Sequence, residues 1–496
     1  MMYISTRGNY PAVTASQAIG LGMVPQGGLF IPRSFPQLSK EAYSAARTYK
    51  EVARSVFELL LTDFTTEELE LCIESAYNSE TFDTSSVVNT VSLGPDKLVM
   101  ELWHGPTAAF KDIALQIMPH LLASAKKKTG NAMHTVILVA TSGDTGKAAL
   151  EGFKNAEGIS IIVFYPYEGV SEIQQLQMTT TDGGNTAVVA VHGNFDDCQT
   201  GVKELFADAL LRTKMRSSGI EFSSANSINW GRLCPQIVYY FTAYADAVRR
   251  GMAADGEPVD FCVPTGNFGN ILAGYYARCM GLPVDKLICA SNKNRVLADF
   301  FATGVYNRNR EFFRTNAPSM DILISSNLER FLYAITGGDA GRINAWYGDL
   351  AERGTFTVDN QTRTAIDEVI LSGWIDEELV LSTIRKVYEK HRYVLDTHTA
   401  VGVALNDQLA RRGRKTIIAS TASPYKFSCD VLGALDEAAY KDEFSCIDRI
   451  AAVSGTKVHS ALRGLRDRPV LHRRLIDTSQ MRETVLDIIE RRSPAL

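Results

Sequence analysis

His104-Gly-Pro-Thr-Ala-Ala-Phe-Lys111-Asp112 is the stretch around which the chain is organised. Before it, residues 90–103 alternate apolar and polar side chains, which predicts a strand. After it, apolar residues recur at helical spacing until three consecutive lysines and Gly130, a common way for a helix to end. The pattern therefore predicts that Lys111 lies in or near the first turn of a helix.

Lys111 is an unusual residue for that position. The N-terminus of a helix carries partial positive charge, which is unfavourable for an ammonium group. The same charge lowers the pKa of an amine that must lose its proton in order to react. Small residues at positions 105, 108 and 109 leave room for a flat ligand. One interpretation is a Schiff-base lysine and the other is an ordinary surface lysine on a helix, and this stretch alone does not choose between them.

Length and composition limit the class of protein. At 496 residues, the chain has the length of two or three domains. A hydrophobic content of 45% and a charged content of 22% are typical of a soluble globular protein. The net charge of −5 and the isoelectric point near 6.0 give no electrostatic reason to expect nucleic acid or a membrane surface as a partner.

Targeting and metal-binding patterns are also missing from the sequence. The first residues lack the apolar segment of a signal peptide, and no apolar run has the length of a membrane span. The eight cysteines form no Cys-x-x-Cys pair, and the eight histidines show no metal-binding spacing. We expect a cytoplasmic protein with reduced cysteines and no metal site.

Short apolar runs alternate with helical patterns along most of the chain, which indicates an α/β fold with parallel strands. The clearest strands are 135–140, 159–164 and 186–191, and the helices after them are 143–153, 171–178 and 197–214. A second series follows residue 227, and we expect an insertion or loops in its polar stretch 307–373. We predict an N-terminal domain over 1–92, a large domain from 93–130 and 221–496, and a small α/β subdomain over 131–220.

Parallel strands deliver the loops that follow them to one edge of a sheet, where ligands bind. Thr141 to Gly146 follows a predicted strand, and its hydroxyls and backbone N–H groups suit a carboxylate or phosphate. A nucleotide P-loop is a poor match, because Thr141 stands where the motif needs glycine and Ala148 where it needs serine or threonine.

Three further loops follow strands of the second series. Gly266-Asn-Phe-Gly-Asn270 has two glycines three apart, which lets backbone amides close around a phosphate. Thr421 or Ser423 could offer a neutral hydroxyl to a ring nitrogen. We expect Asp396 to Gly402 to be a capped helix start that could also contact the site. Together with the lysine, these loops fit pyridoxal phosphate, the cofactor that serves as an electron sink for a carbanion.

In these segments the chain resembles the threonine synthases, which belong to the tryptophan-synthase-like class of pyridoxal phosphate enzymes. The Gly266–Asn270 loop is the most specific match, since the wider class usually has a run of glycines there. The matching segments are Ser5–Gly8, Gly27–Phe30, His104–Asp112, Thr141–Gly146, Ser171–Met178, Ala225–Asn229, Pro264–Asn270 and Ser420–Phe427.

The resemblance implies two open, twisted, mostly parallel sheets with flanking helices (fold type II), plus an N-terminal α/β layer. It implies a reaction in which O-phospho-L-homoserine and water give L-threonine and phosphate. Lys111 would hold the cofactor and move protons. The residues implied to bind the cofactor are Lys111, Gly266, Asn267, Phe268, Gly269, Asn270 and Thr421. The residues implied to surround the substrate are Thr141, Ser142, Asp144, Thr145, Asn229 and Arg232.

Other interpretations stay open at this point. The substrate phosphate needs a second anion site, for which the candidates are Lys147, Lys154, Lys203, Asn229 and Arg232. A threonine-synthase-like phospholyase would release phosphate and a keto acid instead of threonine. A serine or threonine dehydratase and a non-catalytic binding protein on this fold are further alternatives. We expect a monomer or homodimer acting on a small molecule.

Overall fold

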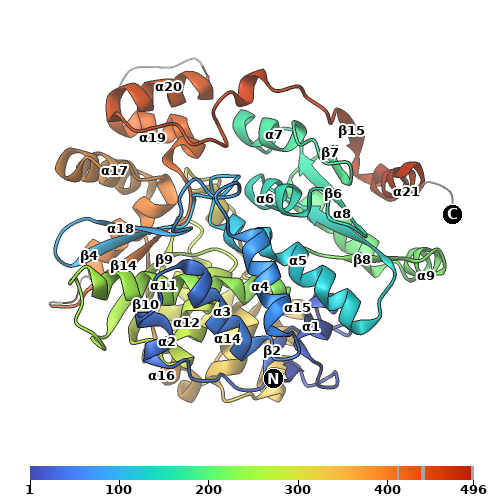
Figure 1. Cartoon of the computed structure of the whole chain (residues 1–496), viewed down its shortest axis with the longest axis horizontal. Coiled ribbons are helices and arrows are strands. Elements are labelled where there is room, and N and C mark those ends of the chain that lie inside the picture. Colours follow the sequence, from blue (N-terminus) through green and yellow to red (C-terminus); the bar gives the residue numbers. More distant parts are fainter. Residues whose placement is uncertain (410, 412, 437–441, 493–496) are drawn as a thin grey trace.

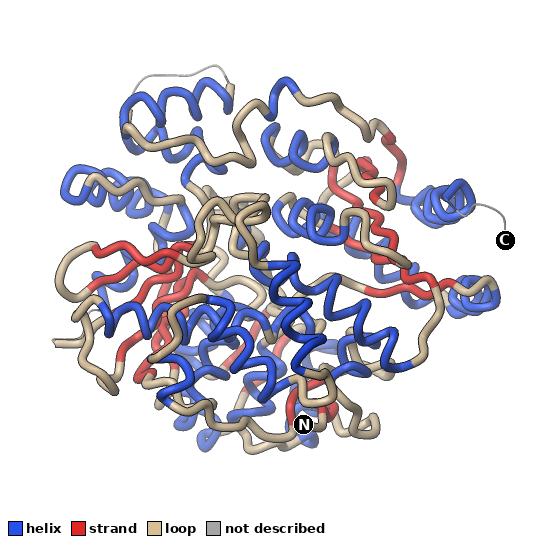
Figure 2. Tube along the Cα trace, in the orientation of Figure 1, coloured by secondary structure: helices blue, strands red, loops and turns tan. Residues whose placement is uncertain are grey.

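Two β-sheets form the framework of the protein, and Figures 1 and 2 show their strands as two separate groups with helices around them. The computed structural model describes residues 1–409, 411, 413–436 and 442–492. The larger sheet has six strands, in the order β13 (Ile370–Trp374), β10 (Val284–Ser291), β9 (Val259–Pro264), β14 (Thr416–Ser420), β4 (Lys97–Glu101) and β3 (Asn89–Ser92). Only its edge pair, β3 and β4, is antiparallel.

The second sheet has five strands and is parallel throughout. Its order is β15 (Arg474–Asp477), β7 (Thr186–His192), β6 (Ile159–Pro166), β5 (His134–Ala140) and β8 (Ile220–Ser223). The predicted α/β class with two mostly parallel sheets is confirmed. β8 and β15 lie outside the predicted segment 131–220 although they pair with its strands, and the domain boundaries stay a prediction.

Apolar runs become central strands here because helices cover both faces of each sheet. In β5, Val136 and Leu138 join one apolar cluster, whereas Ile137 and Val139 join another on the opposite face. The first cluster includes side chains of α8 (Phe195–Ala207) and α21 (Met481–Arg492). A strand buried on both faces therefore reads as a continuous apolar run in the sequence.

Helices α5 (Lys111–Thr129) and α6 (Asp144–Phe153) pack closely against each other. Gly152 makes this approach possible, because a Cβ there would lie 2.1 Å from the carbonyl oxygen of Leu115. Each helix begins with a residue of the predicted site, Lys111 or Asp144. The contact therefore fixes the distance between those two residues.

The first ninety residues form an α/β layer against the six-stranded sheet and its helices. The layer contains β1 (Tyr3–Ser5), α1 (Ala15–Leu21), β2 (Phe30–Pro32), α2 (Lys40–Ser44), α3 (Tyr49–Leu60) and α4 (Thr66–Ala76). Polar contacts join it to α14 (Leu328–Ile335): Arg7 pairs with Glu329 at 2.9 Å, and the Arg330 Nε donates to the Phe30 carbonyl at 2.8 Å. This layer packs against the helices of the larger sheet and supports them.

Two expectations from the sequence are wrong. Residues 307–373 hold ordered elements, because short helices with polar faces and aspartate caps look like loops in a sequence. They are β11 (Val305–Asn307), α14, α15 (Ala340–Arg353), β12 (Thr355–Thr357), α16 (Asn360–Asp367) and β13. The single helix predicted over 197–214 is two, α8 and α9 (Ala209–Ser217), since the Asp208 side chain accepts from Leu211 N and starts a new helix.

The remaining helices flank the sheets and complete the described chain. They are α7 (Glu172–Thr179), α10 (Trp230–Leu233), α11 (Pro235–Arg249), α12 (Gly269–Cys279), α13 (Val296–Thr303), α17 (Glu377–His391), α18 (Thr397–Leu409), α19 (Ser428–Leu435) and α20 (Glu443–Ser454), with short 3-10 turns at η1 (Pro318–Met320), η2 (Pro424–Phe427), η3 (Leu465–Asp467) and η4 (Thr478–Gln480). Within the described ranges, none of the helices combines the length and apolar character needed to cross a bilayer.

Candidate active site

The site lies where loops from the two sheets meet. The loops after β4, β9 and β14 come from the carboxyl edge of the larger sheet, and the loop after β5 comes from that of the smaller one. Asp144, at the start of α6, joins the loop after β5 to the loops after β4 and β14. Its carboxylate lies 2.8 Å from the Lys426 Nζ and 3.6 Å from the Lys111 Nζ.

Lys111 is the first residue of α5, as predicted. The loop before it runs alongside the loop after β14: Phe110 N donates to the Thr421 carbonyl at 2.8 Å, and Ser423 N donates to the Ala108 carbonyl at 3.0 Å. Ala108 adopts a left-handed φ of 60°, so this pairing holds a tight turn. The predicted cofactor residues Lys111 and Thr421 are therefore brought side by side.

The amine of Lys111 is tuned by its surroundings. Burial is the largest cause and lowers its pKa from 10.5 to about 8, and the positive charges of Lys426 and Arg232 act in the same direction. The carboxylate of Asp144 opposes them. The lowered pKa agrees with the expectation from the sequence, but desolvation and neighbouring cations produce it.

Asp144 accepts hydrogen bonds from several side chains. Gln174 Nε2 donates to one carboxylate oxygen at 3.0 Å, and Ser319 Oγ donates to the other at 2.9 Å. Burial works to raise the pKa of Asp144, but Lys426 and Lys111 together hold it well below its usual range. The carboxylate is thus ionised and fully engaged in this structure.

The predicted substrate loop is a tight turn that begins α6. The Thr141 hydroxyl accepts from Gly143 N at 3.0 Å and from Gly146 N at 2.9 Å, so it serves the turn itself. Gly143 has a φ of 128°, and a Cβ there would meet the Gln174 side chain at 2.4 Å. Ser142 is exposed and Thr145 is half-buried, which leaves their hydroxyls for a ligand.

The loop Gly266–Asn270 forms the start of α12. Phe268 adopts a left-handed φ of 64°, and its buried ring packs on Phe331 with centroids 5.4 Å apart. In the part of the chain that the structure describes, no side chain caps this helix, so the N–H groups of its first turn lack a capping side chain. Ser325 Oγ donates to the Gly266 carbonyl at 2.9 Å and steadies the loop from behind.

The Asn270 side chain is held by two tyrosines of α11. Its Oδ1 accepts from the hydroxyls of Tyr239 at 2.7 Å and Tyr240 at 2.8 Å. Its Nδ2 is buried and has no hydrogen-bond partner in the described part of the chain. A buried donor without an acceptor is costly, so this Nδ2 is available to an acceptor such as a phosphate oxygen.

The structure does not choose between the hydroxyls of Thr421 and Ser423, the two predicted partners of a ring nitrogen. Thr421 is buried, and its carbonyl rather than its hydroxyl holds Phe110. Ser423 Oγ is buried without a partner among the described residues. Either hydroxyl can serve a ring nitrogen next to Lys111.

Asn229 and Arg232, both predicted to meet the substrate, have different surroundings. The Asn229 amide is occupied: Nδ2 donates to the Ile19 carbonyl and Oδ1 accepts from Gly231 N at 2.9 Å. Arg232 is buried, donates to the Ala225 carbonyl at 2.5 Å, and forms no ion pair within the described ranges. Burial lowers its pKa to about 10. A buried guanidinium without a carboxylate suits an anionic ligand.

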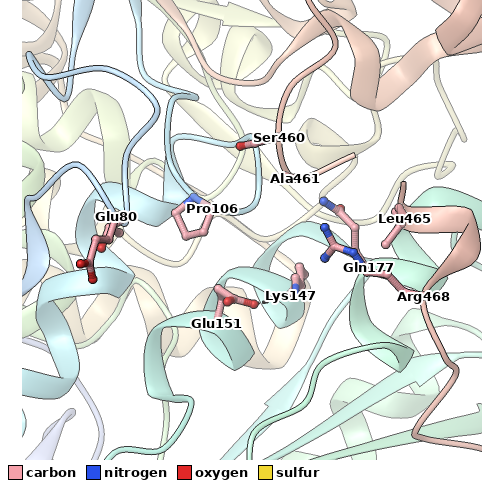
Figure 3. A pocket seen from close by; sticks show the side chains of 10 residues that line it. Glu80, Pro106, Lys147, Glu151, Gln177, Ser460, Ala461, Leu465 and Arg468 are labelled. Atoms are coloured by element: carbon pink, nitrogen blue, oxygen red, sulfur yellow. Dashed lines mark hydrogen bonds and ion pairs between the residues drawn. The ribbon is translucent and has the colours of Figure 1, made fainter. Parts of the chain in front are cut away.

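The other basic candidates already have partners. Lys147 is buried and pairs with Glu151 at 2.7 Å, Lys154 lies 4.0 Å from the same carboxylate group, and exposed Lys203 donates to Gln199 at 3.0 Å. Lys147 also lines a cavity of about 170 Å³ beside the loop that precedes α5 (Figure 3). The cavity is lined by Glu80, Thr81, Pro106, Lys147, Glu151, Gln177, Ser460, Ala461, Leu465 and Arg468.

Sequence reasoning missed four residues around Asp144: Lys426, Ser319, Gln174 and His398. His398 Nε2 accepts from Ser319 N at 3.0 Å and so positions that serine. One feature of the sequence could have pointed to Lys426: it lies between two aromatic residues, Tyr425 and Phe427, in a segment that is buried. Ser319 falls in the stretch where loops were expected. Within the described residues, no cluster of three or more potential metal-binding side chains has the geometry to hold an ion.

Comparison with known proteins gives a consistent family. A family model described as the threonine synthase N terminus matches residues 2–77. The chain is 35% identical to the threonine synthase of Methylobacillus glycogenes over 448 residues, which is 88% of this chain and 92% of that protein. It is 37% identical to threonine synthase-like 1 of Homo sapiens over 501 residues, or 97% of this chain, and spans 65% of that relative's length, just under two thirds.

Solved structures agree. The pyridoxal phosphate-bound threonine synthase of Brucella melitensis is 34% identical, with a TM-score of 0.88 and coverage of 100% of both chains. The threonine synthase of yeast is 31% identical, with a TM-score of 0.88 and coverage of 99% of each chain. With this identity and this coverage of whole relatives, the chain belongs to the threonine synthase family.

Proposed function

We propose that the protein is a threonine synthase that uses pyridoxal phosphate to convert O-phospho-L-homoserine and water into L-threonine and phosphate. Its membership of the family supports the reaction. The observation that carries the proposal is the largely buried Lys111 amine, with a pKa of about 8, at a site whose loops also hold two buried groups without partners among the described residues, Asn270 Nδ2 and Ser423 Oγ.

These residues fit the cofactor. Lys111 would hold it through its amine, and the uncapped N–H groups of Asn267, Phe268 and Gly269 with the Asn270 amide would hold its phosphate. The hydroxyl of Thr421 or Ser423 would face the ring nitrogen. When bound, the cofactor supplies an electron sink for the carbanions of the reaction.

The chain's own side chains would bind the substrate and move its protons. Arg232 supplies a buried cation, unpaired within the described ranges, for a substrate anion, and the exposed Ser142 and half-buried Thr145 supply hydroxyls. Lys111, once free of the cofactor, takes a proton from one carbon of the substrate and returns it to another, a task that suits an amine with a pKa near working pH. Asp144 stays ionised and orients that amine.

A product assay tests the proposal. Purified protein is incubated with pyridoxal phosphate and O-phospho-L-homoserine, and phosphate, threonine and keto acid are measured together. A threonine synthase gives phosphate and threonine in equal amounts, and Lys111→Ala lowers both to background. Equal amounts of phosphate and a keto acid would identify a phospholyase instead, and release of neither product would reject both reactions.

The wider setting follows as part of the same proposal. We propose a cytoplasmic enzyme acting on a small molecule, as a monomer or homodimer. Of the basic candidates, the geometry favours Arg232 for the substrate phosphate, because Lys147, Lys154 and Lys203 already have polar partners. A larger rise in KM for O-phospho-L-homoserine in Arg232→Met than in Lys203→Met would agree.

A further inference from the structure

Lys426 is a buried lysine that the proposed reaction does not yet use. Its side chain has no exposed surface, and its Nζ lies 2.8 Å from an Asp144 oxygen. The same Nζ donates to the Thr107 carbonyl at 2.9 Å. An ammonium group loses a large hydration free energy on burial and persists only where it is paired and hydrogen-bonded. Because burying this ammonium group is unfavourable, we ask what Lys426 does for the neighbouring Lys111.

The two partners of Lys426 belong to different elements of the site. Asp144 belongs to α6, packed on the five-stranded sheet, and Thr107 belongs to the loop that leads into α5. Asp112 holds the other polar groups of Thr107, accepting from its N at 2.8 Å and from its Oγ1 at 2.6 Å. Removing Lys426 would therefore take the charged partner from both the Thr107 carbonyl and Asp144 Oδ1, and leave them only amide donors, Gln177 Nε2 at 3.5 Å and Gln174 Nε2 at 3.0 Å.

We propose that Lys426 is a positioning residue that keeps the Asp144 carboxylate ionised and directed at Lys111 while anchoring the loop in front of it. The inference deepens the proposed function, on which its catalytic meaning rests. Without Lys426, Asp144 would keep one cation of the described chain within ion-pair distance, Lys111, and would bind its proton more tightly.

The charged groups that face Lys111 determine the sign of the effect. They are Asp144 from α6, Lys426 from η2 and Arg232 from α10, and the Phe110 ring lies 5.9 Å from the Nζ. Lys426 favours the neutral amine directly by repulsion and indirectly by sharing Asp144. Its removal should therefore raise the pKa of Lys111 above the present value of about 8.

The first test uses cofactor-free protein, so that it does not depend on turnover. Lys111 is modified with cyanate at pH 7, and its rate of carbamylation is measured by peptide mass spectrometry. Only the neutral amine reacts, and one pKa unit changes its fraction about tenfold. We expect Lys426→Met to slow the modification roughly tenfold. The matched control is Lys386→Met, at an exposed position of α17, which should leave the rate unchanged.

A double variant separates this role from a purely structural one. In Lys426→Met/Asp144→Asn, both the repelling cation and the attracting carboxylate are gone, and the labelling rate of Lys111 should return to the wild-type rate or exceed it. The double variant also removes both members of the buried ion pair together, so we expect it to fold even where the single variant does not. A wild-type rate in Lys426→Met, or a slow rate in the double variant, would overturn the inference.

The second test is turnover. If wild-type protein makes threonine, the acid limb of its kcat profile should move to higher pH in Lys426→Met, because Lys111 is a free amine only after substrate has bound. Lys426→Arg should restore the limb in part. An unmoved limb in active Lys426→Met would overturn the inference while leaving the proposed function standing. Absence of threonine from the wild type would remove the proposed function even where the labelling of Lys111 shifts.

Discussion

Gly152→Ala should weaken the protein through a single contact between α5 and α6. The added methyl carbon would lie 2.1 Å from the Leu115 carbonyl oxygen and 2.8 Å from its carbonyl carbon. Real contacts of a Cβ are ordinary only from 3.4 Å, so the helices would have to separate by more than about 1 Å. Because the obstacle is backbone, no rotamer change can relieve it.

The size of the change in the free energy of unfolding can be judged by comparison with a glycine whose added methyl group would meet no neighbour. Overpacking of a dense interior typically costs about 1–3 kcal/mol. Replacing a glycine inside an exposed helix with alanine instead stabilises by about 0.8–1 kcal/mol. Gly348 is such a glycine: it lies inside α15, is exposed, and a methyl group added there would meet no described atom within 4 Å. The same substitution should therefore have opposite signs at the two positions.

Thermal unfolding of cofactor-free protein, followed by circular dichroism, measures both variants. Gly152→Ala should unfold below the wild type and Gly348→Ala at or above it. The activity of Gly152→Ala, measured well below its unfolding temperature, should also fall, because Leu115 is one turn from Lys111 and a displacement of about 1 Å can cost about a hundredfold in rate. If Gly152→Ala unfolded at or above the temperature of Gly348→Ala, the close approach of α5 and α6 would be refuted.

Three further predictions concern the site. Asn270→Leu should lower the affinity for pyridoxal phosphate at least tenfold, because it removes a buried hydrogen-bond donor worth about 1.5–3 kcal/mol to a charged acceptor. An unchanged affinity in an equilibrium titration would show that the Asn270 Nδ2 does not bind the phosphate. Arg232→Met should raise KM for O-phospho-L-homoserine more than it lowers kcat, and a wild-type KM would exclude Arg232 from substrate binding. The rate at which pyridoxal phosphate binds covalently, followed by absorbance, should rise about tenfold per pH unit below pH 8 and level off above it, since only the neutral amine of Lys111 reacts. A rate that does not depend on pH would contradict this.

The periodic parts of the chain were predictable because each reports one physical constraint. The run at 135–140 is apolar throughout, since β5 is covered on both faces, and the pattern after Lys111 stops at Gly130, where α5 ends. The stretch 307–373 was not predictable, because its helices are short and polar on one side, and their place is set by packing against one another, β12, β13 and α12.

The site was predictable only in outline. Loops after parallel strands come together at a sheet edge, which predicted the meeting of Lys111 and Thr421. The contact between Asp144 and Lys426 joins residues far apart in the sequence and depends on how the two sheets are oriented. Nothing in local sequence reports that orientation, so the charge that balances Asp144 was missed. Asn229 is an error in the other direction. It was predicted to bind the substrate, but its side chain caps the start of α10.

Reductive trapping tests the central claim most directly. The protein is loaded with pyridoxal phosphate, treated with borohydride, digested, and analysed by peptide mass spectrometry. The account predicts a pyridoxyl group on Lys111 and on no other lysine, and its loss in Lys111→Ala. A group found on Lys426 or Lys147 in the wild type, or no covalent attachment at all, would contradict it.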